Sequence, residues 1–508
     1  MIRIGKNITG PVTESADVCI IGSGSGGAVA AAVLAEAGKE VVILEEGGHF
    51  TSRDFTGREA EMYPMLYRDG GSQFTTDGGI NVMQGRAVGG STVINAADCT
   101  RIPPEVLEHW KKHHAVEGIN EKSLQDSYRR VEITLGVNQI HASQVNQNNA
   151  LLLEGAERLG MKGDLFRTNR TGCAGIGTCL IGCPINAKKG AHLNFIPRAQ
   201  VAGARIYADT RADKIVVRNG RATGVRGSIL DREKGIATYP IEVTAKRIII
   251  AAGAIHSPLL LARSDLGGSQ VGRNLSLQPQ IPVIAIFPER IDPWKGIPQS
   301  AYVDAFDHNT PEEGLGGYRM EGVAGGPVFG STVFPGFGEN HLEIFRNFPK
   351  TAIALILVPD RPGDGFVSAQ KGGGAKIVYS VRDRWRENAR KGIAAAAECY
   401  FEAGAERVCW SDETVAPFES FGKLESALQD APLKTASARL ISAHCQGTCR
   451  MGEDPKKSVV DSRGTLRGVK GVTICDTSIF PSSASTHTMI PTMVMADLIT
   501  RRLIDAGI

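Results

Sequence analysis

Apolar and polar blocks alternate along the first fifty residues in an order that predicts a strand, a loop, a helix and a second strand. The apolar run VCII at 18–21 is followed by the glycine-rich segment GSGSGG at 22–27. An alanine-rich stretch of helical composition comes next, and the apolar run VVIL at 41–44 leads directly into Glu45. This order is that of a βαβ unit, so the N-terminal segment predicts an α/β layer.

The glycines of this first loop have the spacing of a dinucleotide site. Gly22, Gly24 and Gly27 match the pattern G-x-G-x-x-G. The first glycine permits a tight turn, the second lets the backbone approach a pyrophosphate, and the third lets helix and strand pack closely. Glu45 lies about 20 residues further on, where a ribose hydroxyl needs a carboxylate acceptor. A flexible glycine loop is the alternative, but strand, loop, helix, strand and acid in this order favour the dinucleotide site.

Other apolar runs predict strands further along the chain. The segment RIIIAAGAIHSPLLLARS at 247–264 predicts a strand that is broken at Gly253 and followed by a helix, which would return the chain to the first sheet. Between 286 and 430 the chain is harder to interpret, but PVIAIF, TAIALILV and AKIVYSV are strand-sized and suit a sheet at the floor of a pocket. Five phenylalanines in this part indicate core packing, with an apolar or aromatic substrate pocket as the alternative: Phe329, Phe334, Phe337, Phe345 and Phe348.

Length and charge narrow the classes of function. A chain of 508 residues suggests two or three domains, and a net charge of +3 without a segregated basic block argues against nucleic acid as the main partner. The N-terminal residues lack the apolar core of a signal peptide, which predicts a cytoplasmic location. No apolar run approaches the roughly 18 residues of a transmembrane helix.

Several further motifs follow in a fixed order. They are GRAVGGSTVIN at 85–95, VGRNLSLQP at 271–279, SAHCQGTCRMG at 442–452 and GVTICDTSIFPSSASTHTMIPTM at 471–493. Taken with the N-terminal loop, these segments resemble the glucose-methanol-choline family of flavin oxidoreductases over nearly the whole chain outside about 290–430. The resemblance implies bound FAD and an alcohol substrate.

The resemblance also implies a mixed α/β fold with a Rossmann-like FAD-binding domain assembled from discontinuous segments. We expect residues 1–285 and 431–508 to form that domain, with a cysteine-loop insertion at about 165–195. Residues 286–430 would form a substrate-binding domain on a mostly antiparallel sheet.

Carried over residue by residue, the resemblance assigns the cofactor contacts. Gly22, Gly24, Gly27 and Glu45 would hold the ADP half of FAD, and Asp476 would lie near its flavin end. A further set would lie along the pyrophosphate and flavin: Arg86, Gly89, Gly90, Ser91 and Asn95. Some relatives attach the flavin to a histidine in the GGS segment. Because this chain has Thr92-Val93-Ile94-Asn95 there, we expect non-covalent FAD.

Two histidines are the catalytic candidates. Oxidation of an alcohol removes a hydride, which flavin N5 can accept, and a proton, for which histidine has a suitable pKa. His444 in SAHCQGT and His487 in SASTHTM match the family's general base and its substrate-orienting residue. The alternative for either is a structural histidine. That is our expectation for four histidines outside these motifs: His49, His109, His192 and His256.

Three of the ten cysteines are clustered in TGCAGIGTCLIGCP. Cys173, Cys179 and Cys183 have the spacing C-x5-C-x3-C, and Pro184 follows the last, which is typical of an iron–sulfur segment. We predict a 3Fe-4S cluster, with a four-iron cluster, a structural cysteine loop, a zinc site completed by His192 and a disulfide left open. The segment resembles bacterial flavin sugar dehydrogenases that carry a three-iron cluster, and almost equally cluster-free sterol and long-chain alcohol oxidases.

The sequence therefore predicts FAD-dependent oxidation of an alcohol, either a sugar or an apolar or aromatic alcohol, to a carbonyl. Electrons would pass through the cluster to a c-type cytochrome. By resemblance, a small helper subunit would accompany the chain and could direct its export to the periplasm. The alternatives are an oxygen-using oxidase without a cluster, a hydroxynitrile-type lyase on the same scaffold, and a non-catalytic electron-carrier subunit, against which both filled histidine positions argue.

Overall fold

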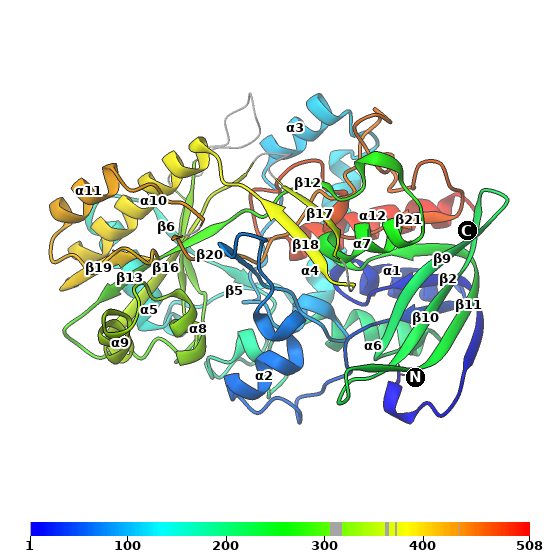
Figure 1. Cartoon of the computed structure of the whole chain (residues 1–508), viewed down its shortest axis with the longest axis horizontal. Helices are drawn as coiled ribbons and strands as arrows, with labels where there is room; N and C mark the ends of the chain where they lie inside the picture. Colours follow the sequence, from blue (N-terminus) through cyan, green and yellow to red (C-terminus); the bar gives the residue numbers. More distant parts are fainter. Residues whose placement is uncertain (1, 305–316, 361–364, 371–372, 436) are drawn as a thin grey trace.

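The structure is a computed structural model that describes residues 2–304, 317–360, 365–370, 373–435 and 437–508. Two large sheets lie side by side, one on the right of Figure 1 with both termini near it and one on the left. Among the described helices none is long and apolar enough to cross a membrane.

The first sheet is the Rossmann-like layer. Its central strands pair in parallel, and β9, β10 and β11 add an antiparallel hairpin extension. In sheet order the strands are β1 (Ile2–Arg3), β8 (Arg205–Tyr207), β3 (Val41–Leu44), β2 (Val12–Ile21), β11 (Ile236–Ile250), β10 (Arg221–Asp231) and β9 (Thr210–Arg218), with β21 (Val472–Ile474) beside β11. The run at 247–250 does return the chain to this sheet, because it is the end of β11 and pairs with β2.

Helices from both ends of the chain cover this sheet. The alanine-rich α1 is almost wholly buried because it packs between the sheet, α12 and α6, which explains its small apolar side chains. The helices on this side of the molecule are α1 (Ser25–Glu36), α3 (Pro104–His114), α4 (Glu121–Leu135), α6 (Phe195–Val201), α7 (Gly253–Arg263) and α12 (Met489–Asp505). The C-terminal α12 thus completes the layer that the N-terminal βαβ unit begins, as expected for a domain made of discontinuous segments.

The second sheet is mostly antiparallel, with only β4 and β20 paired in parallel among its described strands. In order its strands are β4 (Ile80–Val82), β20 (Leu440–Ser442), β13 (Gln280–Ile286), β16 (Thr351–Leu357), β15 (Arg319–Val323), β14 (Ala301–Val303) and β6 (Gly163–Leu165), with β19 (Arg407–Trp410) beside β13. The expected fold class is confirmed. This sheet is not confined to residues 286–430, the range expected for the substrate-binding domain. Four of its strands come from ranges expected in the FAD-binding domain: β4, β6, β13 and β20.

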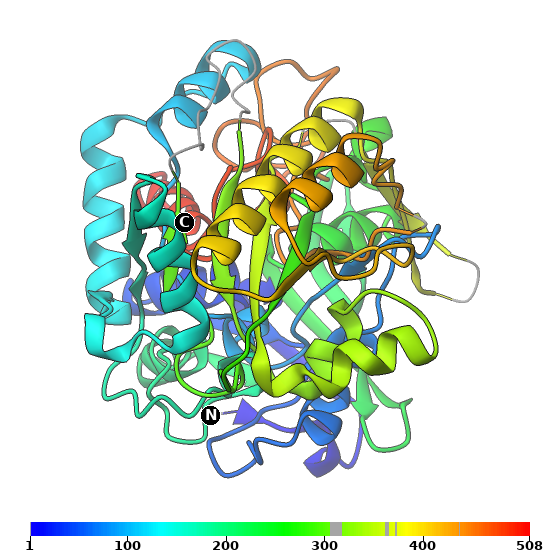
Figure 2. The same ribbon diagram turned by 90° about the vertical axis from the view of Figure 1, so that its left-hand side faces the viewer.

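Both faces of this sheet are covered, which explains the continuous apolar runs of β13 and β16. Val283 and Ala285 face one core together with α10 and α5, while Ile284 and Ile286 face another together with α8 and α9. Figure 2 shows α10 and α11 in front of the strands. These helices are α5 (Gln147–Arg158), α8 (Pro327–Val333), α9 (Glu339–Arg346), α10 (Asp383–Glu402) and α11 (Phe421–Gln429).

The remaining elements are small. AKIVYSV, expected in the pocket sheet, instead contributes β18 to a separate three-stranded sheet. That sheet is β12 (Arg273–Leu275), β17 (Gly365–Ala369) and β18 (Ala375–Tyr379), and β5 (Asn138–Gln139) pairs with β7 (Arg167–Thr168). Helix α2 (Glu59–Leu66) and the 3-10 turns at Gly90–Val93 and Cys179–Ile181 lie close to the site described next.

Candidate active site

The glycine loop between β2 and α1 has the close backbone contacts that its spacing predicts. Gly22 has a φ of 96°, and a Cβ there would lie 2.3 Å from the Ala251 carbonyl oxygen. A Cβ on Gly27 would lie 2.0 Å from the Gly22 carbonyl oxygen. Only glycine fits these two positions, the first for the turn and the second for helix–strand packing.

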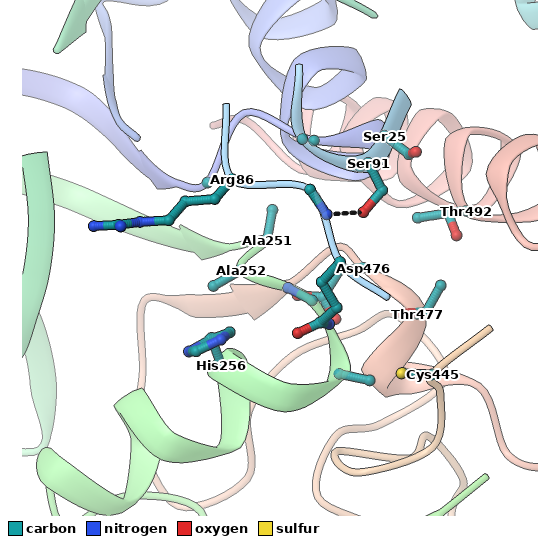
Figure 3. Close-up of a pocket in the computed structure, with 18 of the residues that line it drawn as sticks. Ser25, Arg86, Ser91, Ala251, Ala252, His256, Cys445, Asp476, Thr477 and Thr492 are labelled. Atoms are coloured by element: carbon teal, nitrogen blue, oxygen red, sulfur yellow. Dashed lines mark hydrogen bonds between the residues drawn. The ribbon is translucent and has the colours of Figure 1, made fainter. Parts of the chain in front are cut away.

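A first cavity opens in front of this loop (Figure 3). Gly24, Ser25 and Gly26 line it, and Gly24, the N-cap of α1, has no side chain to bond the free N–H groups of the first turn. A helix N-terminus with uncapped N–H groups at a cavity is a site for an anion such as a pyrophosphate. The cavity encloses about 1000 Å³, its open mouth included. Glycine cradle, uncapped helix and volume together fit a dinucleotide.

Glu45 lies in this cavity at 7% exposure. Its carboxylate accepts hydrogen bonds from the Ser23 N–H at 2.9 Å, the Ser23 hydroxyl at 2.7 Å and the Gly47 N–H at 2.7 Å. Burial raises the pKa of Glu45, and these three donors oppose the rise. The acid therefore orders the glycine loop in addition to facing the position expected for a ribose.

Glu46, the next residue, was not singled out by the sequence. Arg68 binds its two oxygens at 2.8 and 2.9 Å, and Arg86 lies 3.1 Å from it. Burial opposes ionisation, but the two guanidinium groups hold the pKa of Glu46 well below its usual range. Arg86 therefore reaches the cavity wall as part of an ion-pair network, and its Nε has no partner in the described structure.

The second glycine loop, 85–95, closes the other side of the cavity. Gly89 and Gly90 have φ values of 98° and 55°, and a Cβ on Gly90 would lie 2.7 Å from Gly24 Cα. The Ser91 hydroxyl accepts the Gly85 N–H at 2.9 Å, as the dashed line in Figure 3 marks. The two glycine loops therefore touch, and both need glycine for backbone reasons.

Asp476 belongs to the same first cavity. It is 5% exposed, and its carboxylate accepts from the Gly253 N–H at 3.0 Å, the Ser257 hydroxyl at 2.5 Å and the Ser478 N–H at 2.8 Å. Asp476 thus ties the end of β11 to the C-terminal segment. It does not line the second cavity, where the histidines lie.

The two candidate histidines meet in a second cavity. Their ring centroids are 4.9 Å apart and the rings are nearly perpendicular, at 89°. Asn95 lines the same cavity and donates from Nδ2 to the Met489 sulfur at 3.0 Å, while its Oδ1 has no partner in the described structure. The first and second cavities are continuous, since five residues line both: Ser25, Met83, Ser91, Ala443 and Thr488.

The environments of the two histidines shift their pKa values in opposite directions. Burial lowers the pKa of His444 well below its ordinary value, and the nearby His487 and Arg319 lower it further. Burial also disfavours charge on His487, but Glu321, at 2.9 Å from Nε2, and Asp98 together outweigh this and raise the pKa of His487. Groups whose pKa values are pushed apart in one cavity are suited to separate acid and base roles.

The polar residues that the sequence did not single out include Asp98 and Gln299, which line this cavity, and Glu321, which bonds to His487 without lining the cavity. Glu321 on β15 has no exposure, and its second oxygen accepts from Gln299 Nε2 at 2.6 Å. Asp98 is 4% exposed, lines the cavity, and has an Oδ1 without a partner in the described structure. Burial raises the pKa of Asp98 to about 7, with His487 and Arg170 opposing. The sequence signal that could have pointed to Glu321 is a single acid between the apolar residues of RMEGV, the segment that forms β15.

Apolar side chains make up much of the remaining lining of the second cavity, beside polar groups that include Thr92, Gln280 and Thr488. Residues from both sheet-side and loop-side elements line it: Tyr67, Ile94, Leu180, Val323, Phe329, Leu355 and Ile441. Of the five phenylalanines, Phe329 reaches the cavity, Phe334, Phe345 and Phe348 pack in the core beneath α8 and α9, and Phe337 is 87% exposed. The sheet thus forms one wall of the cavity through Val323 on β15 and Leu355 on β16.

The three clustered cysteines do not form a metal site in this structure. Cys179 Sγ accepts from Arg170 at 3.7 Å, whereas Cys173 and Cys183 accept backbone N–H groups of Gly175 and Lys188 at 3.5 Å. Within the described ranges no three His, Cys, Asp or Glu side chains are grouped to hold a metal ion. The residues present therefore do not fit the predicted iron–sulfur cluster or a zinc site with His192, and the ten cysteines are free thiols.

Comparison with known proteins decides the family. The model of the GMC oxidoreductase N-terminal region matches residues 63–280, that of the C-terminal region matches 368–496, and an NAD(P)-binding Rossmann-like model matches 20–83. The chain belongs to the GMC oxidoreductase family. It is accordingly an FAD-dependent oxidoreductase, and the two continuous cavities have the residues to hold that cofactor.

Individual relatives agree with this assignment. An uncharacterized GMC-type oxidoreductase of Mycobacterium tuberculosis is 35% identical over 96% of this chain and 75% of its own length. A long-chain-alcohol oxidase of Arabidopsis thaliana is 29% identical over 96% of this chain and 67% of its own. The crystal structure of pyridoxine 4-oxidase from Mesorbium loti has a TM-score of 0.71 at 18% identity, over 96% of this chain and 99% of that one, and supports the fold.

Proposed function

We propose that this GMC oxidoreductase oxidises an apolar or aromatic alcohol to a carbonyl with non-covalent FAD. The observation that carries the proposal is the histidine pair, with ring centroids 4.9 Å apart, in a largely apolar cavity that is continuous with a dinucleotide-sized cavity. When bound, FAD supplies the hydride acceptor and later yields two electrons to an external acceptor. The residues that line the first cavity would hold its ADP half. Ser91 lies where the two cavities join, and Asn95 lines the second cavity.

His444 would act as the base. Its ring makes no hydrogen bond to another described residue, and its lowered pKa keeps it neutral and able to accept the hydroxyl proton at neutral pH. His487, whose pKa Glu321 raises, would donate in its charged form to the alcohol oxygen and stabilise the negative charge that develops there. Glu321 and Gln299 would fix the orientation of His487.

The apolar wall favours an alcohol with a hydrocarbon or aromatic body over a sugar, because a sugar leaves several hydroxyl groups to be satisfied. The name of the Arabidopsis relatives, long-chain-alcohol oxidase, is consistent with such a substrate. We propose direct transfer of electrons from the flavin to oxygen, in keeping with the name oxidase of the Arabidopsis relatives and with cysteine-loop sulfur atoms that the described structure does not group to hold a metal. This replaces the expected route through a cluster, a helper subunit and a cytochrome.

The test is anaerobic flavin reduction followed by admission of air. We expect 1-octanol and benzyl alcohol to bleach the flavin absorption of the purified holoprotein, glucose to leave it unchanged, and oxygen to restore it with formation of hydrogen peroxide. Bleaching by glucose but by neither 1-octanol nor benzyl alcohol would contradict the substrate class. Bleaching by alcohol without reoxidation in air would contradict the acceptor. A flavin that no alcohol bleaches would contradict the redox function and favour a lyase.

A further inference from the structure

The cysteine loop carries a fully buried ammonium group that the proposed chemistry does not use. Lys188 is 1% exposed, and its Nζ donates to the carbonyl oxygens of Val93 at 2.8 Å, Asn95 at 2.8 Å and Cys179 at 2.6 Å. An ammonium group has three N–H donors, so three carbonyl acceptors match its protonated form. A neutral amine would turn its lone pair toward one of these carbonyl oxygens.

A second buried cation lies beside it. Arg170 is 4% exposed and pairs with Lys188 through an isolated antiparallel bridge. Its Nη2 donates to the carbonyl oxygen of Ala96 and contacts Cys179 Sγ, whereas Nε and Nη1 have no partner in the described structure. Two cations therefore bind three carbonyl groups of one short segment, Val93–Ala97, from behind.

This segment is the wall of the second cavity. Ile94, Asn95, Ala96 and Ala97 line it, and Ala97 has a φ of 69°, a left-handed conformation that costs an L-residue energy. Because all described peptide bonds are trans, a carbonyl drawn toward the cations turns the following N–H the opposite way. Within the described residues the N–H groups of Ala96 and Ala97 have no acceptor.

We propose that Lys188 and Arg170 form a cation clamp that presents the N–H groups of the Val93–Ala97 wall to the flavin and favours the negative charge that the flavin gains on reduction. The proposal rests on the proposed function, since it needs FAD in the second cavity. Buried cations act strongly there because the dielectric is low, and each bound carbonyl is polarised so that the next N–H becomes a better donor. Lys188 and Arg170 are positioning residues. In this proposal the cysteine loop contributes Lys188 and the Cys179 carbonyl group to the clamp.

The experiment compares Lys188→Met with Lys189→Met. Lys189 is the adjacent, less buried lysine, and among the described residues its Nζ donates to the Asn186 carbonyl alone, at 3.0 Å, so it is a matched control. The readouts are the midpoint potential of bound FAD, by equilibration with a reference dye, and the Kd of FAD. For Lys188→Met we expect the ratio of reduced to oxidised flavin at a fixed potential to fall about tenfold, which is about 30 mV for a two-electron couple. Lys189→Met should match the wild type.

Folded, FAD-loaded Lys188→Met with the wild-type potential would overturn the clamp. If that variant does not fold, Arg170→Gln is measured in the same way, since glutamine can still donate to Ala96 but carries no charge. A wild-type potential in Arg170→Gln would overturn the clamp equally. Lys188→Arg, which keeps the charge, should recover most of the potential. The dye measurement needs no alcohol, so failure of the clamp is distinguishable from failure of alcohol oxidation, whereas a protein that binds no FAD overturns both.

Discussion

Glu321 places its Oε1 atom 2.9 Å from Nε2 of His487, across 166 positions of sequence and without any solvent exposure. A buried carboxylate next to an imidazole stabilises the charged ring, because in a low dielectric the opposite charge outweighs much of the desolvation cost. The pair therefore raises the pKa of His487, whereas the pKa of His444 is lowered, although the two rings are in contact.

Glu321→Gln should make flavin reduction more sensitive to alkali. The substitution keeps a hydrogen-bonding group beside His487 but removes the negative charge, so the pKa of His487 should fall. His487 is active in its charged form in our proposal, and the alkaline limb of the rate of flavin reduction should move to lower pH. At neutral pH we expect a loss of about tenfold, the difference between a charge-assisted and a neutral hydrogen bond.

The measurement is stopped-flow flavin bleaching by benzyl alcohol between pH 5 and 10. Glu343→Gln is the control, because Glu343 is an exposed acid on α9 and its one ion pair within the described residues is with Arg407. An unchanged pH profile in Glu321→Gln would exclude an electrostatic role for Glu321.

His444→Ala should leave FAD bound and slow flavin reduction by roughly 10²–10⁴-fold, the usual contribution of a positioned general base. Because burial lowers the pKa of His444, the wild-type rate should stay level on the acid side of the ordinary histidine pKa of about 6.5. His487→Asn should be milder, since an amide still donates to the alcohol oxygen. The exposed His141→Ala serves as control. Wild-type bleaching by His444→Ala would remove His444 from the mechanism.

Glu45→Ala should raise the Kd of FAD about 10- to 150-fold, which corresponds to about 1.5–3 kcal/mol for a charge-assisted contact. The loss has two sources, the ribose contact that we expect and the disorder of Ser23 and Gly47 once their acceptor is gone. Glu40→Ala, an exposed acid just before β3, should bind FAD normally. Equal affinity in both variants would contradict the placement of the ribose.

Denaturation of the holoprotein should release yellow flavin into the supernatant, since Thr92–Asn95 offers no histidine for attachment. Holoprotein prepared without oxygen should contain one FAD per chain. It should contain neither iron nor acid-labile sulfide in an amount comparable to the chain. Flavin retained in the precipitate, or three irons per chain, would contradict these two statements separately.

The sequence was informative where function depends on local backbone geometry. Gly22 and Gly27 could be recognised because turn and helix packing demand glycine at a fixed spacing, and His444 because it lies in a short motif. Glu321, Asp98 and Lys188 acquire their roles from partners far away in sequence, which spacing does not encode. The cysteines show the converse case. The spacing C-x5-C-x3-C fixes distances along the chain but not the directions of the three sulfur atoms, and the described structure does not group them to hold a metal.

The edges of the second sheet were equally hard to anticipate. Strands β4, β6 and β20 have three residues each, too few to show a period, and they join the sheet from segments that also serve the FAD-binding lobe. Their membership follows from tertiary pairing with strands far away in sequence: β20 pairs with β13, β6 with β14, and β4 with β20.

Asp98→Asn should stabilise the fold at alkaline pH and leave it almost unchanged at pH 4. Burial raises the pKa of Asp98 from 3.8 to about 7, so the folded chain holds a proton between these pH values that the unfolded chain has lost. The free energy of unfolding therefore falls as pH rises through this window, and the neutral amide removes that fall. We expect a gain of about 1–3 kcal/mol in the free energy of unfolding at pH 8, measured by urea denaturation of FAD-loaded protein at both pH values.

Asp164→Asn, at an exposed acid, should show no such pH-dependent gain. Equal stability of Asp98→Asn and wild type at both pH values would mean that Asp98 is paired or hydrated in the cavity, and its carboxylate would then be ionised throughout the working range of the enzyme.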